Sequence, residues 1–153
     1  MTQEYIFWPM IVMALLTFIP LGVMAIKRIQ SALRGDTTPD DYKLGESARV
    51  PADVSLPNRN YMNTLEVPLL FHVLSLAIYA TRRVDVVFLS LAWAYVVLRI
   101  GHSIIHLTYN RVTHRVVLFA ASNFVLIAMW VIFALSLFRF GSDSGLFGFI
   151  VMR

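Results

Sequence analysis

Four long apolar segments separated by polar connections form the main pattern of the chain. They cover residues 5–26, 57–80, 86–109 and 116–138. A helix needs about 20 mostly apolar residues to cross the hydrocarbon core of a bilayer, and each segment is that long. Their continuous apolar runs lack the alternation of a transmembrane β-barrel. The pattern therefore predicts an all-α integral membrane protein, a four-helix antiparallel bundle that forms a single domain over residues 1–153.

The connections between these segments differ in length. Residues 30–56 form the longest polar region, and their mixed charges, glycines and prolines predict a surface loop. Ser55 followed by Pro57 predicts the start of the second helix. The connections at 81–85 and 110–115 are short, so successive helices should be antiparallel neighbours.

The composition agrees with a membrane protein and excludes some chemistry. Hydrophobic residues make up 58% of the chain and charged residues 14%, against about 45–50% and 25% in soluble domains. No cysteine is present, which excludes disulfides, cysteine-ligated metals and a cysteine nucleophile. The net charge of +4 is better explained by cations that orient the helices in the bilayer than by a nucleic-acid partner.

The distribution of these cations predicts the orientation. Lysine and arginine are more frequent in the first and third connections than on the other side. The positive-inside rule then places residues 27–57 and 110–115 in the cytoplasm and both termini outside. We expect a multi-pass protein of an inner or plasma membrane.

A polar stripe interrupts the second apolar segment. Arg59, Asn63 and Glu66 are spaced i, i+4 and i+7, which places them on one face of a helix. A charge within a membrane span is costly unless it faces protein, water or a partner. The stripe is therefore a candidate site, although an Arg59–Glu66 ion pair that only joins helices is an equally weighted alternative.

A second stripe follows the third apolar segment, where Arg99, His102, His106 and Asn110 lie on one helical face. In an antiparallel pair, the start of the second helix and the end of the third lie at the same depth. The two stripes should therefore meet near the cytoplasmic surface. His102 and His106 could hold a metal with Glu66 as third ligand, but hydrogen bonding or a polar ligand is favoured, and we expect no metal. Arg99 could bind a ligand carboxylate or pair with Glu66.

The second-helix motif resembles that of the MAPEG family, the membrane-associated proteins of eicosanoid and glutathione metabolism. The matching residues are Arg59, Asn63, Glu66 and Pro68, and the four-span layout of a bacterial-type member also agrees. The resemblance implies a homotrimer with glutathione bound between subunits near the cytoplasmic face. It also implies that Arg59, Asn63 and Glu66 hold this cofactor.

The third helix departs from the family pattern. His102 and His106 stand where the resemblance implies tyrosines, and the arginine that stabilises the glutathione thiolate is expected near Thr113, between Arg111 and Arg115. The candidate catalytic residues are therefore Arg111 and Arg115. The candidate cofactor-binding residues are Arg59, Asn63, Glu66, Arg99, His102 and His106.

The matching second helix and the differing third helix leave two candidate functions. The first is a glutathione transferase or peroxidase that acts on a lipophilic small molecule entering from the bilayer. The alternative is a non-catalytic trimeric membrane protein that binds a lipid or a partner. The second-helix motif favours the enzyme, and the altered third helix favours the alternative.

Overall fold

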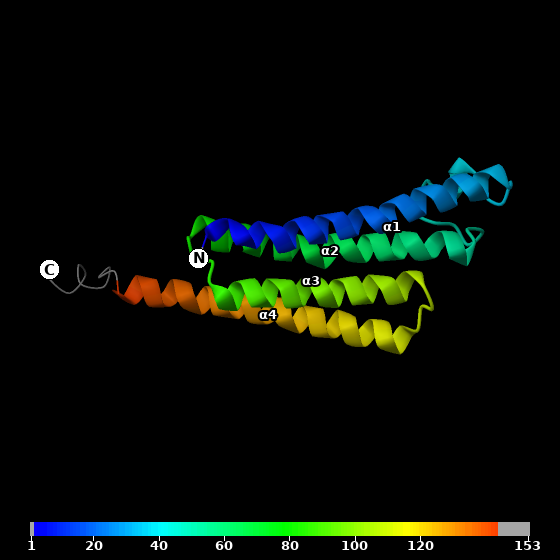
Figure 1. Ribbon diagram of the computed structural model, residues 1–153. Coiled ribbons are helices and arrows are strands. Elements are labelled where there is room, and N and C mark those ends of the chain that lie inside the picture. The colour runs from blue at the N-terminus through cyan, green and yellow to red at the C-terminus, as the bar shows by residue number, and fades with distance from the viewer. Residues whose placement is uncertain (1, 144–153) are drawn as a thin grey trace.

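The computed structural model describes residues 2–143, which are helical apart from their connections (Figure 1). The last ten residues of the predicted domain, 144–153, lie outside this part. The elements are η1 Gln3–Ile6, α1 Phe7–Leu33, η2 Pro39–Tyr42, α2 Ala52–Ala80, α3 Val86–Leu107 and α4 Val112–Asp143. Four of these helices are long and apolar enough to cross a membrane. The predicted all-α membrane bundle is confirmed, while the single domain over 1–153 stays a prediction.

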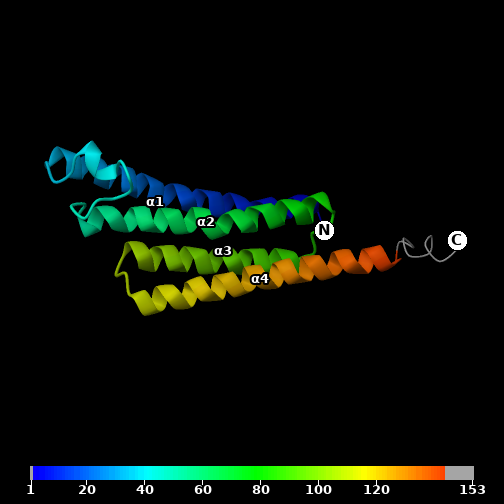
Figure 2. The same cartoon turned by 180° about the vertical axis from the view of Figure 1, so that it is seen from behind.

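The four helices lie side by side as two antiparallel pairs, α1 with α2 and α3 with α4 (Figures 1 and 2). The connections 34–51 and 108–111 lie at one end of the bundle, which we call the loop end. The N-terminus and the connection 81–85 lie at the opposite end. The start of α2 and the end of α3 therefore share one end of the molecule.

Two helices continue further into the polar region than the sequence predicts. α1 runs to Leu33 rather than to residue 26, and α2 begins at Ala52 rather than at Pro57. Gly35 ends α1, because its φ of 78° suits a residue without a side chain. Pro51, with an extended ψ of 147°, precedes α2. The polar connection is thus shorter than 30–56, and the ends of both helices carry charged side chains.

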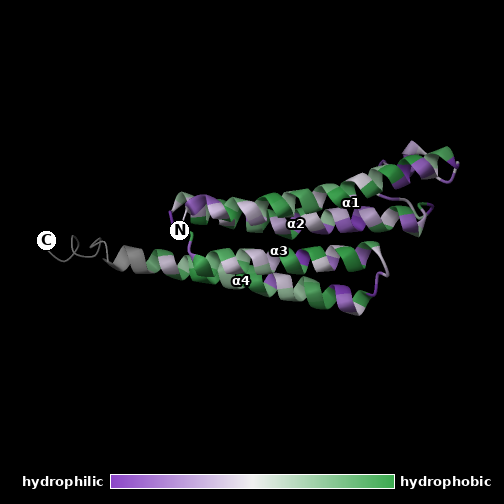
Figure 3. Cartoon of the chain, in the orientation of Figure 1, coloured by the Kyte–Doolittle hydropathy of each residue, from purple (hydrophilic) through white to green (hydrophobic). Residues whose placement is uncertain are grey.

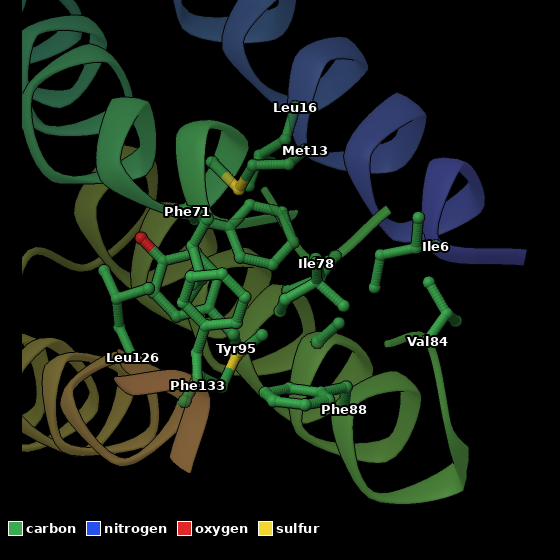
Figure 4. Close-up of a cluster of buried hydrophobic side chains, with 14 residues drawn as sticks. Ile6, Met13, Leu16, Phe71, Ile78, Val84, Phe88, Tyr95, Leu126 and Phe133 are labelled. Atoms are coloured by element: carbon green, nitrogen blue, oxygen red, sulfur yellow. The ribbon is translucent and has the colours of Figure 1, made fainter. Parts of the chain in front are cut away.

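An apolar core fills the half of the bundle away from the loop end (Figure 4). Phe71 of α2 stacks on Tyr95 of α3, with ring centroids 4.7 Å apart. The other large members are Ile6, Met13, Leu16, Leu74, Ile78, Val84, Phe88, Leu126, Met129 and Phe133. Hydrophilic residues of α2 and α3 lie toward the loop end instead (Figure 3). The interior is therefore apolar at one end and polar at the other.

Asp41 organises the polar connection at the loop end. Its side chain accepts hydrogen bonds from the backbone N–H and hydroxyl of Thr38, at 2.8 and 3.0 Å, and from the Ser47 hydroxyl at 2.7 Å. The Thr38 N–H, followed by the Ser47 and Thr38 hydroxyls, lowers the pKa of Asp41 from 3.8 to about 2. Arg49 lies 3.9 Å from the same carboxylate.

One ion pair attaches this connection to α1, and a second joins α1 to α2 beside it. Arg28 of α1 lies 3.3 Å from Glu46, and its guanidinium carbon lies 4.5 Å from the ring centre of Tyr42. Lys27 pairs with Asp53 of α2 at 3.1 Å. The connection is thus held over the loop end, where the two polar stripes lie.

Candidate functional site

The two helices that carry the polar stripes, α2 and α3, are joined toward the loop end by a hydrogen bond. The Asn60 amide donates to the Ser103 hydroxyl at 2.7 Å, and both side chains are buried. Thr64, one turn after Asn60, is also buried. The sequence analysis predicted this meeting of helices but did not single out these three residues.

The buried face of α2 is displaced from the predicted stripe. Arg59 and Glu66 are exposed, and Asn63 is half-buried. Within residues 2–138, neither Arg59 nor Arg99 forms an ion pair with Glu66. The structure therefore does not contain the Arg59–Glu66 or Arg99–Glu66 pair that the sequence left open. The stripe lies beside the buried face, toward the outside of the bundle.

Arg99 of α3 joins three helices at this depth. Its side chain is only 1% exposed. The guanidinium donates to the backbone carbonyl of Asn63 in α2, and its carbon lies 5.5 Å from the ring centre of Phe119 in α4. Its Nε and Nη1 atoms have no hydrogen-bond partner within the described residues. Arg99 is thus a buried cation in contact with both α2 and α4.

A hollow of about 210 Å³ is lined by Asn63 and Phe119, the two residues that Arg99 contacts, and we call it the inner hollow. His102 is buried in its wall, and its Nε2 has no partner among residues 2–143. The Nε of Arg115 is also buried without a partner in this part of the chain. The lining residues are Asn63, His102, Arg115, Val116 and Phe119.

A larger hollow of about 640 Å³, the outer hollow, lies beside it at the loop end. Arg59 lines it from α2, and Asn110 lines it from the α3–α4 connection. The remaining lining residues are Glu46, Ser47, Ala48, Val50, Ala52, Ser55 and Leu56. Arg59 and Asn63 are neighbours on α2 and line different hollows, so α2 forms a wall of both.

The structure distinguishes the two candidate catalytic arginines. Arg115 lines the inner hollow, and its Nη1 donates to Asn110 Oδ1 at 2.6 Å. Arg111 is exposed and lines neither hollow. Asn63, His102 and Arg115 are therefore brought together, whereas Arg111 is not among them.

His106 lies one turn nearer the loop end of α3 than His102. It is fully buried, and both of its ring nitrogens lack a partner in the described part of the chain. Its ring centroid lies 5.9 Å from that of His102. Glu66 is on the exposed face of α2. No group of three or more metal-binding side chains is found within residues 2–143.

The buried polar residues that the sequence analysis missed follow a recognisable signal. Pro57, Asn60, Thr64, Pro68 and Phe71 are all buried and recur every three or four residues, as one helical face requires. Extending the apolar face of Phe71 backwards along α2 reaches Asn60 and Thr64. The charged residues Arg59 and Glu66 lie on the adjacent, exposed face of α2.

Comparison with known proteins agrees with this architecture. The model of the MAPEG family matches residues 6–135 of the 153. No curated protein and no solved structure matches the chain. The matched range includes both polar stripes and nearly all of the four helices. The chain therefore belongs to the MAPEG family.

Proposed function

We propose that the protein is a membrane-bound glutathione transferase or peroxidase that acts on lipophilic electrophiles. The observation that carries this proposal is the inner hollow, where Asn63, His102 and Arg115 line one cavity. The unpartnered Nε atom of Arg115 and Nε2 atom of His102 fit a ligand that brings hydrogen-bonding groups. The apolar walls Val116 and Phe119 fit a substrate that arrives from the bilayer.

The chemistry of the side chains matches glutathione, which has two carboxylates, one amino group and one thiol. Arg59 in the outer hollow offers a cation for a carboxylate, and Glu66 offers an anion for the amino group. Asn63 and His102 of the inner hollow complete the proposed cofactor site, and the buried Arg99 and His106 lie on the same face of α3 as His102. When bound, glutathione supplies the thiol that reacts with the electrophile.

Arg115 is the residue that we assign to the thiol. A cation near a thiol favours its ionised form and lowers its pKa, so that thiolate is available at neutral pH. Arg115 lines the cavity, whereas Arg111 is exposed outside it. Phe119 and Val116 form an apolar side of the cavity, where the field of the guanidinium is screened less than in water.

The position of Glu66 supports a homotrimer. Glu66 is exposed on α2 among the exposed side chains of Met62, Leu65, Leu69 and Leu70. A carboxylate on such a surface within the bilayer is costly unless protein or water covers it. Neighbouring subunits would cover it and would supply the second wall of a glutathione site at the subunit boundary.

A glutathione titration on purified protein tests the proposal. Arg59→Ala and Glu66→Gln should each weaken binding about tenfold, because each removes a charged partner worth about 1.5 kcal/mol. Arg115→Ala should lower the absorbance of bound thiolate and leave most of the binding. Arg111→Ala is the matched control and should behave like the wild type.

The alternative is a non-catalytic trimer that binds a lipid or a partner. It is favoured by one observation, the presence of His102 and His106 where the family resemblance implies tyrosines. If millimolar glutathione produces neither binding heat nor thiolate absorbance, the enzyme proposal fails and this alternative replaces it.

A further inference from the structure

We propose that Asn110 is a positioning residue that fixes the guanidinium of Arg115 at the inner hollow without neutralising its charge. This inference rests on the proposed function, because it explains what holds the Arg115 guanidinium where it would face the thiol of glutathione.

The backbone of Asn110 is suited to this place in the chain. Its φ of 48° lies in the left-handed region, which asparagine and glycine adopt more readily than other residues. Its N–H donates to the carbonyl of Ile105 at 2.8 Å, which closes the end of α3. The side chain is therefore attached to a turn whose direction the backbone determines.

Two contacts fix Arg115 to the end of α3. The Nη1 atom donates to Asn110 Oδ1 at 2.6 Å. The carbonyl of Arg115 lies 3.1 Å from Nδ1 of His102, which is within hydrogen-bonding distance. Both the guanidinium and the backbone of Arg115 are thus held, while its buried Nε stays without a partner in the described residues.

Because the amide of Asn110 is neutral, it holds Arg115 without reducing the positive charge of the guanidinium. A carboxylate in its place would form an ion pair with Arg115 and reduce the attraction of this cation for a second anion. No ion pair involves Arg115 within residues 2–138. Asn110 supplies an acceptor for the guanidinium and leaves its full charge for an anionic ligand.

Asn110 also links the two hollows. It lines the outer hollow with Arg59, and its partner Arg115 lines the inner hollow with Asn63. A ligand that contacts Arg59 and reaches the cation of Arg115 would extend past this pair. Asn110 is therefore placed to align the two parts of the proposed glutathione site.

The test uses two variants that keep the backbone conformation of Asn110. Asn110→Asp keeps the acceptor and adds a negative charge, and Asn110→Gly keeps the left-handed turn but removes the acceptor. The full-length protein in detergent is titrated with glutathione, and thiolate absorbance is followed against pH. Gln30→Glu, on an exposed position of α1, is the control for the change in net charge.

In Asn110→Asp, the pH midpoint of thiolate formation should rise by about one unit, because the new carboxylate offsets the cation. In Asn110→Gly, the thiolate signal at neutral pH should fall while glutathione affinity changes little. Gln30→Glu should match the wild type. A merely structural role of Asn110 would change helix content or affinity and would leave the pH midpoint in place.

The outcomes separate this inference from the function on which it rests. If the wild type forms thiolate and Asn110→Asp titrates at the same midpoint, the positioning role is wrong and the proposed function stands. If the wild type forms no thiolate at all, the proposed function fails and this inference fails with it.

Discussion

Pro68 changes the hydrogen bonding of α2 at the level of a single residue. Proline has no backbone N–H, so the carbonyl of Thr64, four residues earlier, loses its partner in the helix. The hydroxyl of Thr17 in α1 lies 3.3 Å from this oxygen and donates to it. The same Thr17 hydroxyl lies 3.1 Å from the carbonyl of Met13 in its own helix. One hydroxyl thus connects α1 to the interrupted turn of α2.

We expect Thr17→Val to destabilise the protein by about 1 kcal/mol, because it leaves the Thr64 carbonyl without a donor in an apolar surrounding. The measurement is unfolding by a denaturing detergent in mixed micelles. Thr17→Ser should retain most of the stability, since it retains the hydroxyl.

A double-mutant cycle provides the control for this contact. Pro68→Ala restores an N–H to α2, so in that background Thr17→Val should cost less than in the wild type. Equal costs in the two backgrounds would mean that the hydroxyl contributes nothing through the Thr64 carbonyl.

The candidate residues show how far sequence reasoning reaches at this scale. Charge and spacing predicted that the stripes of α2 and α3 meet, and Asn63 and His102 do line one hollow. They did not decide whether Arg59 and Glu66 are buried within one chain, because a charge in a membrane span can face protein, water or a partner; both are exposed. The buried residues of α2 recur every three or four positions along the whole helix, and Asn60 and Thr64 lie on the same buried face as Phe71.

At the scale of an element, Asp41 is the residue on which the connection 34–51 depends. Two oxygens of its carboxylate accept three hydrogen bonds, and an amide has only one oxygen to accept them. We expect Asp41→Asn to raise the rate of trypsin cleavage after Lys43 and Arg49 severalfold in intact membranes.

Asp40→Asn is the matched control. Asp40 pairs with Lys43 at 2.6 Å, but both side chains are more than 70% exposed, and exposed pairs contribute little to stability. The rate of trypsin cleavage of Asp40→Asn should therefore equal that of the wild type. If Asp40→Asn and Asp41→Asn are cleaved alike, the hydrogen bonds of Asp41 do not order this connection.

The lowered pKa of Asp41 also predicts a pH dependence. A carboxylate with a lower pKa in the folded protein stabilises the fold above its ordinary pKa of 3.8, and this contribution is lost as the pH falls to about 2. Hydrogen exchange of the Ser47 amide, which donates to the Asp41 carbonyl, should therefore accelerate in this range, after correction for intrinsic exchange. In Asp41→Asn this acceleration should be absent.

The ends of the helices were less predictable than their existence. The apolar runs predicted four helices, because hydrophobicity over about 20 residues is a strong signal. α1 and α2 extend further, to Leu33 and from Ala52, into residues of mixed charge. Hydropathy gives no signal there, and the caps at Gly35 and Pro51 determine where the helices end.

At the scale of the whole molecule, the orientation in the membrane stays a prediction that cysteine labelling can test. The chain has no native cysteine, so single variants report one position each. Lys43→Cys at the loop end should be protected from an impermeant reagent in intact cells, and Glu4→Cys at the opposite end should react. Both are exposed in the structure. Labelling of Lys43→Cys from outside would reverse the orientation and move the proposed site to the other side.

The assembly is the second prediction at this scale. Mass measurement in mild detergent should give three chains per particle, because a neighbouring subunit would cover Glu66 on the outer surface of α2. Glu66→Lys should weaken the assembly if a cation faces this carboxylate across the boundary, and Glu66→Gln should weaken it less. A single chain per particle in the wild type would exclude a glutathione site at a subunit boundary.

The division of the interior into an apolar end and a polar end has a consequence for how such a protein can evolve. Packing of Phe71, Phe88 and Tyr95 secures the bundle at one end, while the buried polar side chains of Arg99 and His102 lie toward the other. Effects of substitutions at distant sites are nearly additive. Changes in ligand preference can therefore accumulate at the loop end with little effect on the packing that keeps the four helices together.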